Sequence, residues 1–330
     1  MKISVIICTH NPRLDYLQLV LKSLEEQTLA KKEWELLLID NRSDKSLKKT
    51  VDLFWHPYAR IVRENKLGLT HARMRGIKES KTEILIFVDD DNVLNKDYLE
   101  QAVSIAARLP CLGCFGAAKI IPLFEKQPKK EVLEVADLLA LRNILEDKWS
   151  NLPDDDYVPW GAGLVVRASV AKKHSAALRQ RKSNMQLDRS GHMLLSCGDN
   201  DFSWTACKNG YAKGVFTALR VSHLIPDERL KKSYLCQIAE GHGFSHVLLR
   251  AIHNKSLKIF QEQPSSLEII KAIFKNDTEV ILRWLRNIYI ERKQAPLKRA
   301  VMRAWKRGID RAIIQISRAT RKSEKQNLRH

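Results

Sequence analysis

The chain has 330 residues, and 44% of them are hydrophobic, which is enough to bury a sizeable core. It carries 57 Lys and Arg residues against 38 Asp and Glu, a formal net charge of +19 that favours an anionic partner such as nucleic acid, an acidic membrane surface or a phosphorylated substrate. Six scattered cysteines in a chain of this length argue against a disulfide-stapled scaffold, and the sequence lacks the run of about 18 apolar residues that a transmembrane helix needs.

The first hundred residues alternate between apolar runs typical of buried strands and segments with helical spacing. In chain order, the predicted elements are a strand over 3–8, a helix over 14–24, a strand over 34–39, a helix ending near 54, a strand over 60–62, a helix over 69–80 and a strand over 83–88. This alternation predicts an α/β fold built on a doubly wound, mostly parallel sheet. Ligands of such sheets bind at the carboxyl ends of the strands, where this chain has polar clusters at 9–11, 40–44 and 89–92.

The remainder of the chain is less regular. The predicted elements are a strand over 113–122, a helix over 131–149, a turn at 153–156, a strand over 164–167, a helix over 199–209 and a strand over 212–222. From residue 256 onward the sequence turns basic and strand-poor, which predicts helices outside the core. We therefore expect a catalytic domain over residues 1–250 and a basic helical extension over residues 251–330.

The most informative segment is the apolar strand that ends in Asp89, Asp90 and Asp91. Adjacent carboxylates repel one another and are costly to bury, and a divalent cation offsets that cost. Mg²⁺ and similar ions are commonly held by one or two carboxylates together with substrate phosphates. The alternative is a solvated acidic turn in which Asp91 or Asn92 caps a helix.

Several segments resemble, in order and spacing, those of the family 2 glycosyltransferases of GT-A fold. They are the opening strand at 4–11, Asp40 after the second strand, the segment 65–73, the three aspartates at 89–91, the segment 196–202 and His223. The resemblance implies an inverting transfer of a sugar from a nucleotide-diphosphate donor, with UDP as the expected nucleotide, to an acceptor hydroxyl. It also implies a divalent cation, Mn²⁺ or Mg²⁺, and an enzyme of the bacterial surface-polysaccharide type.

The resemblance further implies roles for individual residues. Asp91, with Asp89 nearby and His223 as a further ligand, would hold the cation, which stabilises negative charge on the leaving diphosphate. Asp199 would be the base that takes the proton of the acceptor hydroxyl, and Asp201 competes for this role because the family's acidic residue ahead of the base is missing here. The residues expected to contact the donor are Thr9, Asn11, Asp40, Arg73, Asp89 and Asp90.

These roles have structural alternatives. Asp199 would cap the helix over 199–209, and it could do so while acting as the base. Asp40 would be a turn residue rather than a partner of the nucleotide base. Arg73 would lie on a solvated helix face rather than reach a ribose or phosphate.

The segment that precedes the strand over 164–167 has the chemistry of an acceptor site. Trp160 offers an aromatic face to a sugar ring, and Gly161, Ala162 and Gly163 permit close approach of a ligand to the backbone. The alternative is a core tryptophan ahead of a tight turn.

Three other functions are compatible with parts of this pattern. A nucleic-acid-binding protein would suit the charge, but the excess of basic over acidic residues lies mainly in the tail and aromatic residues amount to only 7%, so we expect no nucleic-acid partner. A nucleotidyltransferase also uses strand-end carboxylates with a metal, yet the segment after the first strand, 9–13, has no glycine to cradle a triphosphate. An inactive relative kept as a scaffold would not need Asp89, Asp91 and Asp199.

The tail contains a basic amphipathic helix. Its apolar residues follow one another at steps of three or four: Leu297, Val301, Trp305, Ile309, Ile313 and Ile316. Such a helix can lie on an anionic membrane surface or pack on its own protein. We expect a cytoplasmic protein at the inner face of the cell membrane, where its acceptor would be a glycan or a lipid-linked glycan.

Overall fold

The computed structural model describes residues 1–153, 157–181, 187–189, 194–257 and 292–327, together with 278, 279, 282 and 286. The chain forms two compact units, residues 1–127 with 136–229, and residues 128–135 with 230–330. Residue 250 belongs to the second unit, and the expected functional division at that residue stays a prediction. The turn predicted at 153–156 falls mostly on 154–156, which lie outside the described residues.

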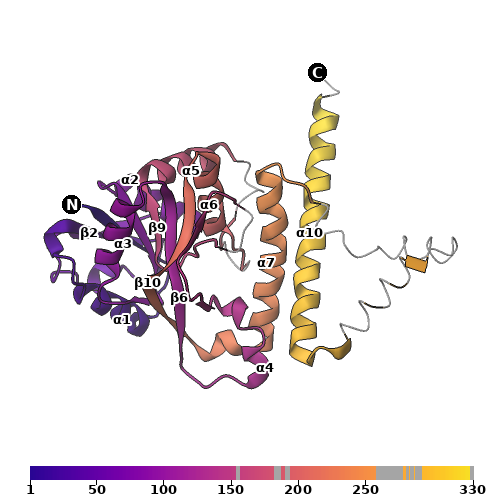
Figure 1. The fold of residues 1–330 in the computed structure, drawn as a ribbon, viewed down its shortest axis with the longest axis horizontal. Helices are drawn as coiled ribbons and strands as arrows, with labels where there is room; N and C mark the ends of the chain where they lie inside the picture. The colour runs from indigo at the N-terminus through magenta and orange to yellow at the C-terminus, as the bar shows by residue number, and fades with distance from the viewer. Residues whose placement is uncertain are drawn as a thin grey trace. The chain divides into compact units, whose positions relative to one another are not determined.

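The first unit is built on one ten-stranded sheet (Figure 1). Its strands are β1 (Ile3–Thr9), β2 (Trp34–Asp40), β3 (Ala59–Arg63), β4 (Ile84–Asp89), β5 (Asn92–Leu94), β6 (Leu112–Phe124), β7 (Arg142–Asn143), β8 (Lys148–Ser150), β9 (Leu164–Arg167) and β10 (Ala212–Ile225). The order is β3-β2-β1-β4-β9-β6-β10-β5, with β7 beside β6 and β8 beside β10. Strands β3, β2, β1 and β4 run parallel, as do β6 and β10, and β9 is antiparallel to both its neighbours. The predicted α/β fold with a mostly parallel sheet is confirmed.

Helices cover both faces of this sheet because its strands are apolar on both sides. The longer ones are α1 (Leu14–Glu25), α2 (Leu69–Glu79), α3 (Tyr98–Arg108), α5 (Ala168–Gln180) and α6 (Gly198–Lys208). Alternate residues of β1 enter different cores: Ile3, Val5 and Ile7 pack with α1 and α3, whereas Ile6 packs with α2, α5 and α6. Two helical layers therefore hold the strands in place and leave their carboxyl ends free for a site.

Two predicted helices are wrong. After residue 44 the chain makes only a 3₁₀ turn, η2 (Leu47–Lys49), because Val51, Leu53 and Trp55 pack on the core at every second position, which is an extended pattern. The segment over 131–149 forms the short helix α4 (Lys130–Leu133), the 3₁₀ turn η3 (Ala136–Leu139) and then β7 and β8. Those strands gain backbone hydrogen bonds from β6 and β10, which the local helical spacing did not reveal. The remaining 3₁₀ turns are η1 (Lys31–Glu33) and η5 (Asp227–Leu230).

The second unit pairs the helices α7 (Lys232–Ile252) and α10 (Pro296–Asn327), which lie side by side (Figure 1). Their backbones approach closely at Gly243 and Gly308, where a Cβ would meet the carbonyl oxygens of Trp305 and Glu240, respectively. Glu240 also forms ion pairs with two arginines of α10, Arg307 and Arg311. Glycines at the crossing thus let the helices pack with their main chains nearly in contact.

The apolar stripe of the tail is divided between the interior and the surface. Leu297, Val301 and Ile309 are buried in the helix pair. Trp305 is 41% exposed, and Met302, on the same side of α10, is 43% exposed. Half of the predicted stripe therefore packs on its own protein. Among the described residues, no helix combines the length and apolarity needed to cross a bilayer.

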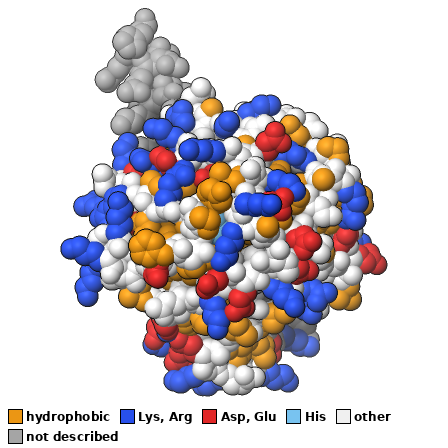
Figure 2. Space-filling model, turned by 90° about the vertical axis from the view of Figure 1, so that its left-hand side faces the viewer, with side chains coloured by type: hydrophobic (Ala, Val, Ile, Leu, Met, Phe, Trp, Pro, Cys, Tyr) orange, Lys and Arg blue, Asp and Glu red, His pale blue; other side chains and the backbone are white. Residues whose placement is uncertain are grey.

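Charge is mixed over the face of the molecule seen in Figure 2, where Lys and Arg side chains alternate with acidic and hydrophobic ones. On this face the Lys and Arg side chains form no single stripe.

Candidate functional site

The carboxyl ends of β1, β2 and β4 bring the three predicted polar clusters together. Thr9 pairs in register with Asp40 across β1 and β2, and the Asn41 amide donates to the carbonyl oxygen of Thr9 at 2.8 Å. Asn11, which has a φ of 48°, fastens the two loops, because its side-chain amide donates to Asp44 at 2.9 Å and its side-chain oxygen accepts from the Asp44 amide at 2.9 Å. Register and a reciprocal side-chain clamp thus shape one edge of the site.

Asp40 is buried at the bottom of this edge. Its Oδ1 accepts the Ser43 amide at 2.9 Å, and its Oδ2 pairs with Nη1 of Arg63 at 2.7 Å. Burial alone would raise the pKa of Asp40, but these partners outweigh it and hold the pKa below its usual value. The carboxylate therefore shapes the turn that follows β2.

The acidic turn after β4 is electrostatically uneven. Burial and the charge of Asp91 raise the pKa of Asp89, and the same two causes raise that of Asp90 to about 6. Asp90 accepts a hydrogen bond from the hydroxyl of Thr9, so it is tied to the end of β1. Burial would also raise the pKa of Asp91, but its contacts with His223 and Arg229 outweigh that effect and lower it. Asp91 is therefore the carboxylate whose negative charge the fold stabilises most.

Asp91 contacts the side chains of His223, from β10, and Arg229, from η5. Its Oδ2 lies 2.7 Å from Nη2 of Arg229 and 3.5 Å from Nε2 of His223, and Nη1 of Arg229 lies 2.9 Å from the same His223 nitrogen. The antiparallel pairing of β10 with β5, which sets His223 opposite Asn92, brings these groups to the acidic turn. The structure thus joins the predicted ligands Asp91 and His223.

The side chains of this acidic turn and its neighbours supply only some of the ligands that a divalent cation needs. Within the described ranges, no three His, Cys, Asp or Glu side chains gather closely enough to hold a metal alone. Asp91 and His223, with Asp89 in the same turn, would therefore need further ligands, such as oxygen atoms of donor phosphates, to hold a Mg²⁺ or Mn²⁺ ion. The guanidinium of Arg229 supplies positive charge at the same carboxylate.

Arg73 lies inside the protein, not on a solvated helix face. It is only 7% exposed, its Nη1 pairs with Asp188 at 3.2 Å, and its guanidinium lies 5.9 Å from the ring centre of Phe87. Burial lowers its pKa, but the charges of Asp188, Asp89 and Asp199 outweigh this and raise it. Arg73 is therefore a fixed positive charge among three carboxylates at the centre of the site.

Asp199 and Asp201 have different environments although both lie in the first turn of α6. Oδ2 of Asp199 accepts the Gly161 amide at 2.8 Å, and Oδ1 accepts the Asn200 amide at 2.9 Å. Asp201 is 1% exposed and is held by Nε2 of His174 at 3.1 Å and by Nη1 of Arg181 at 2.8 Å. Asp199 both meets a helix-end amide and faces the site, whereas Asp201 is committed to a buried ion pair.

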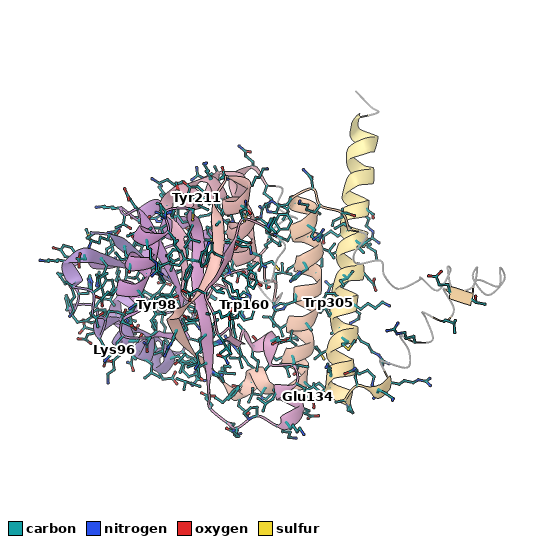
Figure 3. The ribbon with its side chains drawn as sticks, viewed as in Figure 1. Lys96, Tyr98, Glu134, Trp160, Tyr211 and Trp305 are labelled. Carbon is teal, nitrogen blue, oxygen red and sulfur yellow. The ribbon has the colours of Figure 1, made fainter. Side chains whose placement is uncertain are left out.

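The segment from Trp160 to Gly163 forms a backbone wall beside Asp199. A Cβ at Gly161 would lie 3.1 Å from Nη2 of Arg73, so a side chain here would make that guanidinium give way by a few tenths of an ångström. Gly163 has a φ of 76° and accepts the Tyr98 hydroxyl at 2.6 Å (Tyr98 and Trp160 are labelled in Figure 3). Ala162 packs in the core at 6% exposure, and Trp160 is only partly buried. Trp160 and Gly161 therefore border the site, and Ala162 and Gly163 support them.

The sequence of residues 4–173 matches the model of a known family, described as glycosyl transferase family 2. The chain belongs to glycosyl transferase family 2. Glycosyltransferase AglE of Haloferax volcanii is 31% identical over 105 residues, which are 31% of this chain and 34% of that protein. Poly(ribitol-phosphate) beta-N-acetylglucosaminyltransferase TarS of Staphylococcus aureus is 30% identical over 107 residues, 32% of this chain and 18% of the relative. The matched stretch thus spans about a third of the first relative and less than a fifth of the second.

Solved structures share the fold at low sequence identity. Staphylococcus aureus TarS 1-349 in complex with UDP-GlcNAc superposes with a TM-score of 0.51 and 15% identity, over 94% of this chain and 89% of that one. Mannosyltransferase PcManGT from Pyrobaculum calidifontis, in complex with GDP-Man and Mn²⁺, gives 0.54 and 15% over 92% and 78%. The expected GT-A fold and glycosyltransferase class are confirmed.

Four residues of the site were missed by the sequence analysis: Asn41, Arg142, Asp188 and Arg229. Asn41 accepts the Gly68 amide at 2.8 Å and donates to the Lys66 carbonyl at 2.6 Å, and so fixes the loop ahead of α2. No local pattern marks Asp188 or Arg142, because their partners lie far away in the sequence. The acidic turn did predict a positive partner, but not that Arg229 would be one.

The environment of Asp201 generates a stability prediction. Asp201→Ala should destabilise the fold by about 3–5 kcal/mol, because it leaves Arg181 buried without its carboxylate. Asp199→Ala should have a much smaller effect, since it removes hydrogen bonds from two backbone amides and leaves Arg73 two of its three carboxylates. Thermal or urea unfolding of the two variants checks this. Equal stability of the Asp201 variant and the wild type would contradict a structural role for Asp201.

Proposed function

We propose that the chain is an inverting glycosyltransferase that moves a sugar from a nucleotide-diphosphate donor, with UDP as the expected nucleotide, to an acceptor hydroxyl. One observation carries this proposal. A Cβ at Gly161 would lie 3.8 Å from Oδ2 of Asp199 and 3.8 Å from Oδ2 of Asp89, so both carboxylates border the same small space. A proton acceptor and the donor-side carboxylates thus lie within reach of one bound substrate pair.

The relatives support the donor class. The solved complexes named above contain UDP-GlcNAc and GDP-Man, which are both nucleotide-diphosphate sugars. In this chain Thr9, Asn11 and Asp40 would bind the nucleoside at the ends of β1 and β2. Asp90 and Arg73 would border the diphosphate and the sugar. This assignment also favours the transfer of a sugar over the nucleotidyltransferase alternative.

Asp199 would act as the general base. Two backbone amides hold its carboxylate in one orientation, so an oxygen lone pair can take the proton as the acceptor hydroxyl attacks. A single base beside a single displacement inverts the anomeric centre. The guanidinium of Arg73 would keep Asp199 and Asp89 close together despite their like charges.

Asp91 and Asp89, with His223, would hold Mn²⁺ or Mg²⁺, which when bound supplies Lewis-acid stabilisation of the leaving diphosphate. The Arg229 guanidinium contacts Asp91, the same carboxylate that would bind the cation. With the donor present, this guanidinium would contact phosphate oxygens instead.

We further propose that catalysis belongs to residues 1–250 and membrane contact to the basic extension over 251–330. The acceptor would be a glycan or lipid-linked glycan of cell-surface polysaccharide synthesis, and the protein would act at the inner face of the cell membrane. This is supported by the exposed side of α10, where Met302 and Trp305 are flanked by Arg299, Arg303 and Lys306.

The role of Asp199 predicts a kinetic effect without a binding effect. Asp199→Asn keeps the shape and should slow turnover by about 10² to 10⁴, which is typical of general-base catalysis, while UDP binding is unchanged. Hydrolysis of UDP-GlcNAc and GDP-mannose followed by ¹H NMR needs no acceptor. It should give the β-anomer of the free sugar first, because both donors are α-linked. Asn200→Ala in the same helical turn is the control. Initial release of the α-anomer, or wild-type rates in Asp199→Asn, would refute the mechanism.

The acidic turn predicts dependence on a divalent cation. Chelator should abolish donor hydrolysis and added Mn²⁺ should restore it, and Asp91→Asn should weaken Mn²⁺ binding measured by calorimetry in the presence of UDP. Asp201→Asn is unsuitable as a control because it should disturb the fold, so Asp52→Asn, an exposed carboxylate in the segment between β2 and β3, is used instead. Full activity in excess chelator would contradict this prediction.

The exposed side of α10 predicts salt-sensitive membrane binding. The protein should sediment with anionic vesicles at low salt and be released at high salt, since basic residues near an anionic surface contribute about 1 kcal/mol each. Trp305→Ala combined with Met302→Ala should weaken sedimentation. Phe54→Ala, which removes an aromatic side chain that is 98% exposed in the first unit, should not. Equal sedimentation of all three proteins would rule out this surface as the anchor.

A further inference from the structure

Arg142 is a cation beside the proposed base that the reaction described so far does not use. Its Cζ lies 3.7 Å from the ring centre of Trp160, so the guanidinium stacks on the indole. The antiparallel pairing of β7 with β6, in which Arg142 lies opposite Ile120, sets it at this position. Trp160 is followed directly by Gly161, whose amide holds Asp199. Stacking on Trp160 therefore holds the positive charge of Arg142 near the residues proposed to meet the acceptor.

The guanidinium of Arg142 is incompletely satisfied. Its Nη1 is buried and has no hydrogen-bond partner among the residues that the structure describes. Burial lowers the pKa of Arg142 to about 10, and the charge of Asp199 opposes that effect only in part. The stacked ring attracts the cation but accepts none of its N–H bonds in the guanidinium plane. A buried charged donor without a partner is costly, so it marks a place where a ligand oxygen would be favourable.

The carboxylate that acts on this charge is the proposed base. Asp199 is the acidic group that opposes the lowered pKa of Arg142, and the amide of Gly161, which follows Trp160, holds Asp199. Arg142 therefore lies beside the residue that would meet the acceptor hydroxyl.

We propose that Arg142 and Trp160 form an anion-binding subsite for an acceptor that carries a phosphate or carboxylate group close to its attacking hydroxyl. The planar guanidinium presents paired N–H donors that match two oxygens of either group, and the indole holds it in that orientation. A polyol phosphate or a uronic acid has this chemistry, and a neutral hexose does not. This subsite rests on the proposed function, because Asp199 marks where the acceptor hydroxyl would lie.

The same contact solves an electrostatic problem of such an acceptor. An anionic group brought next to Asp199 would be repelled by the carboxylate that must take the proton of its neighbouring hydroxyl. Arg142 interacts electrostatically with Asp199, so its positive charge would offset this repulsion. A neutral acceptor would gain nothing from a desolvated cation at this position.

Ligand-observed NMR titration tests the subsite, with saturating UDP and the diamagnetic Mg²⁺ present so that the donor site is filled. The probes are glycerol 3-phosphate and glucuronic acid, each compared with its neutral counterpart, glycerol and glucose. We expect the wild type to bind at least one anionic probe and to bind the neutral ones more than tenfold more weakly. Tighter binding of the phosphate or of the carboxylate tells which group the natural acceptor carries.

The variants are Arg142→Gln and Arg142→Lys, with Arg220→Gln on the exposed surface of β10 as the matched control. Arg142→Gln should lose the anionic probe by tenfold or more while UDP binding is kept, and the control should match the wild type. Arg142→Lys keeps the positive charge but loses the paired N–H donors of the guanidinium, so its affinity for the anionic probe should be intermediate. This variant provides the comparison if Arg142→Gln does not fold.

Two results would overturn this subsite. One is that Arg142→Gln, or Arg142→Lys if only it folds, binds the anionic probes as tightly as the wild type. The other is that the wild type binds UDP but neither anion. A protein that binds the anions through Arg142 yet hydrolyses no nucleotide sugar would instead count against the proposed function, so the two failures are distinguishable.

Discussion

Three carboxylates at the end of one buried strand are the constraint around which this site is arranged. The sheet places Asp89, Asp90 and Asp91 where water is scarce, and burial together with the charge of Asp91 raises the pKa of Asp89 and Asp90. The fold answers with a hydroxyl from β1 at Asp90 and with Arg229 and His223 at Asp91. The pairing of β1 with β4 and the antiparallel pairing of β10 with β5 bring the residues of these contacts together.

A second balance of charge lies across the site. Arg73 is buried among Asp188, Asp89 and Asp199, and it can remain charged there because three anions surround it. Its guanidinium lies so close to Gly161 that a Cβ at that position would be only 3.1 Å from Nη2. Since the Gly161 amide also orients Asp199, a single glycine links the donor-side cluster with the proposed base. The side proposed for the acceptor differs, because Arg142 has a stacking partner but an unsatisfied Nη1.

The helix pair of the second unit shows how one amphipathic sequence can serve two surfaces. Glycines at the crossing allow α7 and α10 to bury Leu297, Val301 and Ile309, while Trp305 stays on the outside. The +19 charge of the chain is concentrated neither in this helix alone nor in one stripe of the face seen in Figure 2. Electrostatic attraction to an anionic surface would therefore act together with a few exposed apolar side chains.

The sequence by itself determined the parts that depend on local patterns. Apolar runs of the right length predicted β1, β2 and β4, and the polar residues that follow them predicted where Thr9, Asp40 and Asp89 would meet, because parallel strands end at one edge. Helical spacing also predicted α1, α2 and α6 within a few residues.

Only the tertiary structure decided the parts that depend on distant partners. The segment over 131–149 has helical spacing, yet β7 and β8 gain hydrogen bonds from β6 and β10. Asp199 and Asp201 are equivalent in the sequence, and they separate only because His174 and Arg181 bury one while Gly161 meets the other. Contacts of this kind join residues tens of positions apart, and no local periodicity records them, since their energy arises only when the chain has folded.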